Sequence, residues 1–189
     1  MNPQLMKHNL FHQDRFVKFR SLNILLTLFV FIIFLMTLGC SEVADQSTKF
    51  DLNLYETKDY KDGQKYIFTP NDNKPTIINF WFPSCPPCIS EMPDIDSVYL
   101  EYKNQIDVVG IQLIGIDSVS NGKKFVLEGG FSYAIGADLE SEIVINYDVT
   151  LFPTTLFIDS NGKIIRSWQG IISKEEIIEI INPILNMEN

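Results

Sequence analysis

The sequence predicts an α/β fold in which a central mixed β-sheet is flanked by helices to form a sandwich. Three observations support this class. Short β-branched and aromatic runs, which are typical of buried strands, alternate along the chain with longer segments of helical character. An Asn-Gly turn at 161–162 joins two strands as an antiparallel hairpin. The chain then ends on an amphipathic helix, and strands that alternate with helices in this way form layers around one sheet.

The first half of the domain begins with a predicted hairpin. Residues 50–54 alternate apolar and polar side chains, Asp62-Gly63 marks a turn, and residues 64–68 supply the partner strand. A loop rich in Pro, Asn and Asp then leads to a buried strand at 76–81. We expect a helix over 89–102 and a second buried strand at 108–113.

The second half continues the alternation. We expect a helix over 118–128, although Asn121-Gly122 weakens that pattern. A strand at 131–138 and a helix at 140–147 follow, and the terminal hairpin occupies 154–159 and 163–169. Ser173 and Glu176 form a capping box for the last helix. The apolar face of that helix comprises Ile177, Ile178, Ile181, Ile184 and Leu185.

Two cysteines, Cys85 and Cys88, stand where the strand at 76–81 gives way to a helix. Thiols one helical turn apart lie on the same side, with Cα atoms near the ~5.5 Å separation that a disulfide prefers. Cys85 is expected at the helix start, where free N–H groups and the helix dipole favour a thiolate. The spacing therefore predicts disulfide exchange, with Cys85 as the nucleophile and Cys88 as the resolving thiol.

The same pair has two other interpretations, a static structural disulfide and half of a zinc site. Structural bridges rarely join residues three apart across Pro86-Pro87 at a helix start. Zinc needs further ligands, but His8 and His12 are the only histidines and both precede the apolar segment at 21–39; no second C-x-x-C is present. We therefore expect neither a metal nor a cofactor.

The chain resembles the TlpA/ResA-like branch of the thioredoxin superfamily, whose members are membrane-tethered, extracytoplasmic thiol-disulfide oxidoreductases. The resemblance spans roughly residues 50–185 and rests on four short motifs. They are Phe80-Trp81, Cys85-Pro86-Pro87-Cys88, Glu91-Met92-Pro93 and Phe152-Pro153-Thr154-Thr155, the last of which runs into residues 156–163. The resemblance implies a thioredoxin-like sandwich with the N-terminal hairpin, and it identifies 131–147 as a strand-helix unit inserted in this branch.

Two positions depart from the family pattern. Ser84 stands directly before the first cysteine, where the family often has Trp, and Asn79 stands at the position of thioredoxin's buried aspartate. Because Asn79 cannot titrate, Glu91 is the better candidate for an acid that exchanges a proton with Cys88. Glu91 matches an acidic residue that tunes cysteine reactivity in the ResA-like branch. The alternative for Glu91 is an ordinary exposed glutamate on the helix.

The resemblance also implies a surface for substrates. Pro153 matches the cis-proline that faces the two cysteines across the superfamily's site. The backbone of Phe152 is then expected to pair with an extended substrate peptide by strand addition. The other expected substrate contacts are Trp81, Phe82, Pro86 and Pro87. Trp81 and Phe82 would supply an apolar rim, although aromatic residues beside a strand end are as often part of the core.

The N-terminal forty residues indicate export. Residues 1–20 form a basic leader, and residues 21–39 form a charge-free run of mostly Leu, Ile, Phe and Val. Its length lies between a signal-peptide core and a spanning helix. Leu38-Gly39-Cys40-Ser41 resembles a bacterial lipoprotein processing site, which would make Cys40 the lipidated N-terminus. An uncleaved anchor and a plain cleaved signal are the alternatives, and in each the positive-inside rule places the chain after Cys40 outside the cytoplasm.

The exported part is strongly acidic, because residues 1–40 carry +3 of a total charge of −9 and the remainder carries −12. So acidic a domain is a poor candidate for binding nucleic acid. Residues 40–49 are small and polar and form a tether. Residues 50–189 suffice for one thioredoxin-like domain with its own core, which we expect to be a monomer.

Together these features predict a membrane-attached, extracytoplasmic oxidoreductase that exchanges disulfides with exported proteins. We expect a reductant. A reductase outside the cytoplasm must be supplied with electrons through the membrane, so attachment near a membrane electron donor helps a reductase more than an oxidase. The resemblance implies a role in cytochrome c maturation. One alternative is a peroxiredoxin-like peroxidase, but Phe82 stands where a Thr is needed and Arg166 is the only arginine after residue 39. The other is a copper(I) carrier that uses both thiolates.

Overall fold

The computed structural model describes residues 46–71 and 74–187. Within these ranges the chain forms two sheets and four helices. Their order is β1 (Phe50–Asn53), β2 (Lys65–Phe68), β3 (Thr76–Trp81), α2 (Pro86–Tyr102), β4 (Asp107–Leu113), α3 (Val119–Gly129), β5 (Ala134–Asp138), α4 (Glu142–Asn146), β6 (Thr154–Ile158), β7 (Ile164–Gln169) and α5 (Lys174–Met187). Strands β1 and β2 form the predicted antiparallel hairpin.

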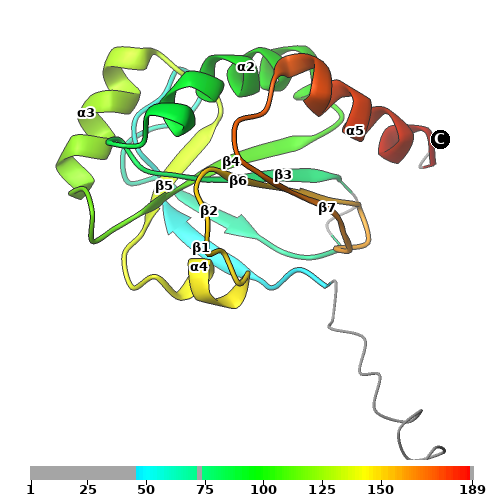
Figure 1. The fold of residues 1–189 in the computed structure, drawn as a ribbon, viewed down its shortest axis with the longest axis horizontal. Helices are drawn as coiled ribbons and strands as arrows, with labels where there is room; N and C mark the ends of the chain where they lie inside the picture. The colour runs from blue at the N-terminus through cyan, green and yellow to red at the C-terminus, as the bar shows by residue number, and fades with distance from the viewer. Residues whose placement is uncertain (1–45, 72–73, 188–189) are drawn as a thin grey trace, which may run out of the picture. The chain divides into compact units, whose positions relative to one another are not determined.

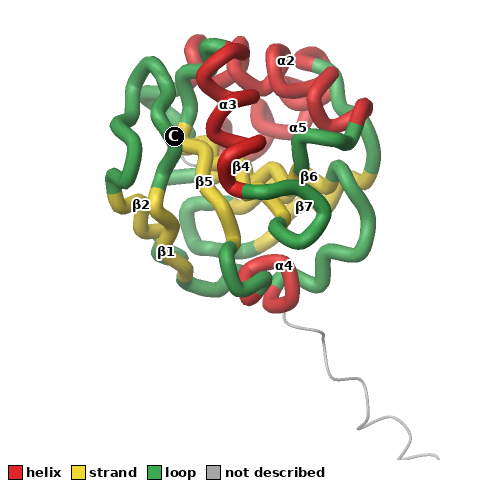
Figure 2. The backbone as a smooth tube through the Cα atoms, turned by 90° about the vertical axis from the view of Figure 1, so that its left-hand side faces the viewer, coloured by secondary structure: helices red, strands yellow, loops and turns green. Residues whose placement is uncertain are grey.

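The other five strands form one mixed sheet in the order β5-β4-β3-β6-β7. Strands β3, β4 and β5 are parallel, whereas β6 runs antiparallel to β3 and β7 antiparallel to β6. Helices α2 and α3 both connect neighbouring parallel strands in the same direction, so crossovers of one hand place them on one face of the sheet. Figures 1 and 2 show α2, α3 and α5 together on that face and α4 on the other. The predicted thioredoxin-like sandwich is confirmed.

Alternation along β3 divides the buried side chains between two hydrophobic clusters, one on each face of the sheet. Ile77 and Trp81 point towards the helices, and Ile78 and Phe80 point towards the hairpin. The helix-side cluster also contains Met92, Ile95, Val98, Ile177, Ile181 and Ile184. The hairpin-side cluster also contains Phe50, Leu52, Phe68, Ile111, Leu156 and Ile158. Asn79 shares the parity of Ile77 and Trp81, so its amide enters the helix-side core.

Helix α2 begins at Pro86, three residues before the predicted start at Ile89. The predicted start left Pro86 and Pro87 outside the helix. In the first turn, however, the missing N–H has no intrahelical partner to lose, and the fixed φ of proline already suits a helix. Cys88 therefore lies inside the helix, and Cys85 is its N-cap.

The ends of the terminal hairpin and of α5 are fixed by side-chain hydrogen bonds. Between β6 and β7, Asp159 Oδ1 accepts from the N–H groups of Asn161 and Lys163, at 3.0 and 2.8 Å. Gly162 alone in this turn has a positive φ, 79°, which glycine adopts without strain. At the start of α5, Ser173 Oγ accepts from Glu176 N–H while Glu176 Oε2 accepts from Ser173 N–H. The predicted capping box is thus present.

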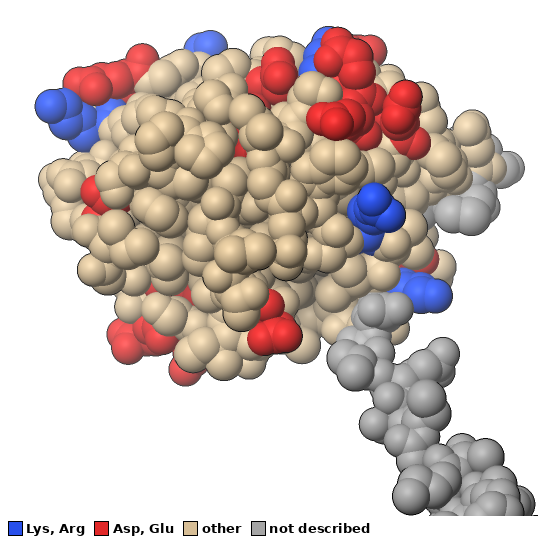
Figure 3. All heavy atoms as spheres, viewed as in Figure 1, with Lys and Arg blue, Asp and Glu red and all other residues tan. Residues whose placement is uncertain are grey.

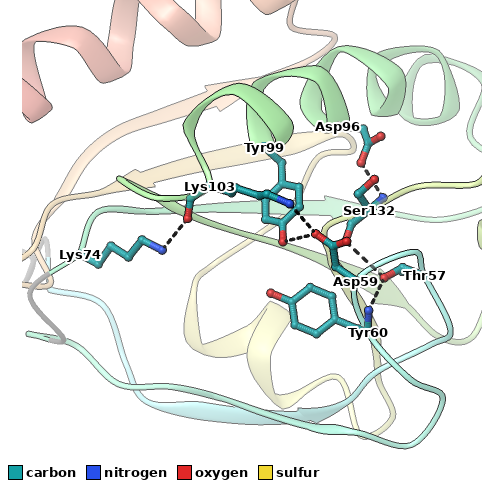
Figure 4. Close-up of polar contacts among 8 residues, drawn as sticks. All are labelled: Thr57, Asp59, Tyr60, Lys74, Asp96, Tyr99, Lys103 and Ser132. Atoms are coloured by element: carbon teal, nitrogen blue, oxygen red, sulfur yellow. Dashed lines mark hydrogen bonds and ion pairs between the residues drawn. The ribbon is translucent and has the colours of Figure 1, made fainter.

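The segment that connects β1 to β2 covers the outer edge of β5 and attaches it to α2. Tyr55 N–H donates to the carbonyl of Ile135 at 2.7 Å, which pairs the chain with the edge strand. Figure 4 shows the next contacts, in which Asp59 Oδ2 accepts from Tyr99 OH and Lys103 Nζ, at 3.0 and 3.2 Å. An edge strand covered in this way is closed to unwanted pairing.

Residues 46–48, the end of the predicted tether, dock far from the two cysteines. Strand β6 runs from Thr154, beside Phe80, to Ile158, beside Thr76. The turn that follows β6 therefore lies at the opposite end of the sheet from α2's first turn. Ser47 donates to the Gly162 carbonyl in this turn through both its N–H and its hydroxyl, at 2.8 and 2.7 Å.

The surface charge is mainly acidic. On the face drawn in Figure 3, Asp and Glu side chains gather over α5, whereas much of the middle is uncharged. The exposed ion pairs, such as Lys65 with Asp51 at 2.8 Å, contribute little to the stability of the fold.

The structure tests only part of the N-terminal predictions. No helix within 46–71 and 74–187 is long and apolar enough to cross a membrane. The basic leader, the apolar segment at 21–39 and Cys40 lie outside the described residues.

Candidate active site

Cys85 and Cys88 form a disulfide at the end of β3 and the start of α2, with their Cα atoms 5.2 Å apart. This is the separation that the spacing predicted. Both cysteines are more than nine-tenths buried, but Cys85 retains 4% exposure and Cys88 none. The neighbouring prolines, Pro86 and Pro87, are exposed. A partner thiol approaching from solvent therefore meets Cys85 first.

Cys85 caps α2 with its own sulfur. The Cys88 N–H donates to Cys85 Sγ at 3.3 Å, and the Ile89 N–H donates to the Cys85 carbonyl at 3.1 Å. Because Pro86 and Pro87 lack N–H groups, these are the first amides that the helix presents. Once the disulfide is reduced, the same N–H and the positive end of the helix dipole would stabilise a thiolate on Cys85.

Glu91 lies one turn beyond Cys88 on α2 and is completely buried, so it is not the exposed helix glutamate of the alternative interpretation. Its carboxylate accepts two hydrogen bonds, from Asn79 Nδ2 at 2.7 Å and from Ile172 N–H at 3.0 Å. Burial raises the pKa of Glu91 from 4.5 to about 7, and the two hydrogen bonds offset only part of that shift. A carboxyl with this pKa can take up and release a proton near neutral pH.

Asn79 joins Glu91 to the strand on the other side of β3. Its Nδ2 donates to Glu91 and also to Thr155 Oγ1, at 3.0 Å, whereas its buried Oδ1 has no hydrogen-bond partner. An amide carries donors on one side and an acceptor on the other. Rotation of the Asn79 amide by 180° would offer Oδ1 to a protonated Glu91. The residue can therefore serve both protonation states of Glu91 without titrating itself.

The loop before β6 closes the site on a second side. The Phe152–Pro153 peptide bond is cis, as the resemblance implied. The Pro153 carbonyl accepts from Gly170 N–H at 2.8 Å, which links this loop to the one that supplies Ile172 N–H to Glu91. The Phe152 ring packs edge-on against Phe82, with centroids 5.5 Å apart, and both rings are partly exposed.

Trp81 does not form part of the surface. Its side chain is fully buried and packs against Phe125, with ring centroids 5.5 Å apart. The expected rim role of Trp81 is therefore wrong. The physical reason is the alternation of β3, which directs Trp81 under α2 and α3. The strand ends at Trp81, and the next residue, Phe82, reaches the surface.

Three polar contacts of the site were not predicted from the sequence. They come from Thr155, from the Ile172 N–H and from Asp117, which binds the backbone and hydroxyl of Ser84. The departure from the family at Ser84 was the one sequence signal that pointed to a new contact there. Within the ranges that the structure describes, no group of three or more His, Cys, Asp or Glu side chains is placed to hold a metal ion.

A five-stranded mixed sheet, a two-cysteine motif at a helix start and a cis-proline loop opposite it define a thiol-disulfide oxidoreductase of thioredoxin-like architecture. The family model described as "AhpC/TSA family" matches residues 43–167. The chain belongs to this family of the thioredoxin superfamily.

Two relatives agree with this assignment, and one solved structure shares the fold. The thiol-disulfide oxidoreductase ResA of Bacillus thuringiensis subsp. konkukian is 30% identical over 126 residues, covering 65% of this chain and 70% of that protein. ResA of Oceanobacillus iheyensis is 28% identical over 195 residues, covering 100% of this chain and 96% of its own length. A thioredoxin-family thiol:disulfide interchange protein from Chlorobium tepidum has a solved structure that matches with a TM-score of 0.65 at 23% identity, covering 74% of this chain and 95% of that one.

Proposed function

We propose that this protein is a membrane-attached, extracytoplasmic reductant of disulfides in exported proteins. The observation that carries the proposal is the Cys85–Cys88 pair at the N-terminus of α2, one helical turn before the buried Glu91. One thiol at the rim, one thiol beneath it and one acid with a pKa of about 7 are the three groups that disulfide exchange requires.

The reaction proceeds in two thiol exchanges. In the dithiol protein, the Cys85 thiolate attacks one sulfur of a substrate disulfide, which forms a mixed disulfide and releases the other substrate sulfur as a thiolate. The Cys88 thiolate then attacks Cys85 Sγ, which restores the Cys85–Cys88 disulfide and releases the second substrate thiol. Two electrons and two protons pass to the substrate. The protein's disulfide must afterwards be reduced by a dithiol donor.

Glu91 serves Cys88 in the second exchange. Cys88 is completely buried, so its thiol cannot lose a proton directly to water. Glu91 lies three residues further along α2 and therefore on the same side of the helix. As a carboxylate it can accept the Cys88 proton, and its pKa of about 7 makes both of its states accessible near neutral pH.

The substrate surface consists of the rims of two loops. Phe82 and Phe152 form an aromatic pair beside Cys85, and the neighbouring Leu151 and Ile171 are 56% exposed each. The exposed prolines of the motif continue this apolar surface. An extended substrate peptide would pair with the backbone of Phe152 and cover these side chains.

Attachment to the membrane rests on the sequence before residue 46. Residues 21–39 would direct export, and Cys40 would carry the lipid or mark the end of a spanning anchor. Either attachment raises the effective concentration of the domain near a membrane electron donor. Apocytochrome c is the substrate class that we propose from the resemblance to the ResA-like branch.

Redox equilibration of the protein against glutathione tests the direction of the reaction. A reduction potential below about −220 mV supports a reductase, and one near −120 mV would replace it with an oxidase.

A Cys88→Ala variant should accumulate mixed disulfides with its substrates, since the resolving thiol is missing. Mass spectrometry of the mature protein should find a lipidated N-terminus at Cys40, and an intact Met1 in the membrane fraction would favour the spanning anchor instead.

A further inference from the structure

Ser84, the residue directly before the proposed nucleophile, is held by a carboxylate from another loop. Its N–H and its hydroxyl both donate to Asp117 Oδ2, at 2.9 and 2.6 Å. Asp117 lies between β4 and α3, 33 residues away in the sequence. The thiol chemistry described above uses neither residue.

Asp117 is itself fixed by its surroundings. Its carboxylate also accepts from the Asn121 side chain. The next residue, Ser118, caps α3 by accepting from Asn121 N–H at 3.1 Å. The loop before it closes through a bridge between Ile114 and Asp117, with Gly115 at a φ of 115° that side chains rarely adopt. Asp117 therefore links the start of α3 to the active-site loop.

The pair offers a reason for the departure at Ser84. A large aromatic side chain at this position would hold the loop by packing. Ser84 is exposed and does not pack. Two hydrogen bonds to an ionised acceptor hold the loop instead, and such bonds are stronger than those between neutral groups.

The pair also fixes a negative charge against the residue that directly precedes Cys85. The hydrogen bonds from Ser84 hold the pKa of Asp117 below its ordinary value, so the carboxylate is ionised at neutral pH. A fixed anion disfavours a thiolate on the adjacent residue, whereas it has little effect on an uncharged disulfide. Asp117 therefore opposes the helix dipole, and it favours the disulfide form of the protein over the dithiol form.

Few ionisable groups lie near Cys85. The first turns of α2 contribute Cys88 and the buried Glu91, and the loop between β4 and α3 contributes Asp117. The remaining loops at this end of the sheet, 150–153 and 170–172, contain no ionisable side chain, and neither do residues 82–84. The charge of Asp117 is therefore not offset by a basic residue from these segments.

We propose that Asp117 is a positioning residue that fixes the active-site loop through Ser84 and, through its charge, makes the Cys85–Cys88 couple a stronger reductant. The inference deepens the proposed function, since it concerns the thiols that carry it. It does not alter the reaction, in which the dithiol gives two electrons and two protons to a substrate disulfide and becomes the Cys85–Cys88 disulfide.

The test uses the full chain in detergent and three variants. Asp117→Asn keeps an oxygen that can accept from Ser84 but removes the charge. Asp51→Asn is the matched control, because it removes one charge from β1, where Asp51 pairs with Lys65. Ser84→Ala keeps the charge and removes only the hydroxyl bond. Two quantities are measured for each protein: the alkylation rate of Cys85 against pH, and the equilibrium with reduced and oxidised glutathione.

In Asp117→Asn, the Cys85 thiol should titrate at lower pH and react about threefold faster near pH 6, the size expected for one unit charge at a partly exposed site. The glutathione equilibrium should move about threefold towards the dithiol, or about 15 mV, since tenfold corresponds to 29.6 mV. High salt should shrink the difference from wild type. Ser84→Ala should shift the equilibrium by less than Asp117→Asn, and Asp51→Asn should leave both quantities unchanged.

Unchanged rates and equilibrium in Asp117→Asn would overturn the inference, and so would an equal shift in Asp51→Asn, which would assign the effect to net charge. The proposed function fails separately, if wild-type Cys85 forms no mixed disulfide or if the wild-type potential lies near −120 mV. The comparison between variants is independent of that value.

Discussion

The two faces of the central sheet are built from the same strands but follow different rules. The hairpin-side cluster consists of aliphatic and aromatic side chains, with Ile78 and Phe80 completely buried at its centre. On the helix side, the same strand buries Asn79 against Glu91, and Asn79 Oδ1, Trp81 Nε1 and Tyr133 OH lack hydrogen-bond partners. Buried polar groups cost stability unless they are paired. The face that buries unpaired polar groups is the one beneath the two cysteines, which indicates that polar groups are kept there for chemistry.

The sharpest contrast between the faces comes from a substitution at Cys85. Cys85→Ser removes the nucleophile but keeps the volume and a capping oxygen at the start of α2, so the fold should persist. Disulfide exchange should fall by about three orders of magnitude or more, since a serine hydroxyl is not ionised near neutral pH. Turnover of a protein disulfide measures the loss of exchange, and the thermal midpoint of unfolding shows whether the fold persists. Residual exchange above one per cent would assign the attack to another group.

Phe80→Ala should show the opposite behaviour on the hairpin side. Phe80 is completely buried, and removal of such a ring costs about 3–5 kcal/mol of unfolding free energy. Because the hairpin-side cluster contains none of the reacting groups, the pH dependence of Cys85 alkylation should match wild type in the folded fraction. Urea unfolding measures the loss. An altered alkylation profile would show that the two faces are coupled.

These two faces were not equally predictable from the sequence. The β-branched and aromatic run at 76–81 predicted a buried strand, and local motifs predicted Cys85 at a helix start and the capping box of α5. The polar contacts beneath the cysteines depend on residues far apart in the chain: Asn79 meets Thr155 across 76 residues, and Ile172 N–H meets Glu91 across 81. Periodicity carries no information on such pairs. The sequence left Trp81 between rim and core, because a strand end gives no sign of what covers it.

The pH dependence of stability separates the faces further. The pKa of Glu91 is raised from 4.5 to about 7 by burial, so the folded protein binds a proton more tightly than the unfolded chain. Its contribution is fully present below pH 4.5 and is lost as the pH rises through about 7. At 1.36 kcal/mol per pKa unit, the oxidised protein should lose about 3 kcal/mol over this range.

Urea unfolding of the oxidised protein at pH 4.5 and pH 8 measures that loss. Glu91→Gln should remove most of the difference, because glutamine has no proton to release, and it should also shift the pH profile of thiol reactivity. Phe80→Ala serves as the control, since it should lower stability equally at both pH values. A slope in Glu91→Gln equal to wild type would assign the pH dependence to other carboxyls.

The smallest expected effect uses two adjacent threonines of β6 that lie on opposite faces. Thr155 is completely buried on the helix side and accepts from Asn79, whereas Thr154 pairs with Phe80 and donates to the Leu151 carbonyl at 2.8 Å. Valine has nearly the shape of threonine, so each Thr→Val change removes one hydrogen bond with little change in packing. Each should cost about 1 kcal/mol, the usual net contribution of such a bond.

The two valine variants should differ in the pH profile and not in stability. In Thr155→Val, Asn79 loses its second partner and holds the Glu91 carboxylate less firmly, so the pKa of Glu91 should rise further and the pH midpoint of thiol reactivity should move with it. Thr154→Val should keep the wild-type midpoint, because its hydroxyl has no link to Glu91. Alkylation of Cys85 across pH 5–9 resolves the two cases. Equal midpoints in both variants would show that Thr155 supports only the fold, and would restrict the polar network to Asn79, Glu91 and the Ile172 N–H.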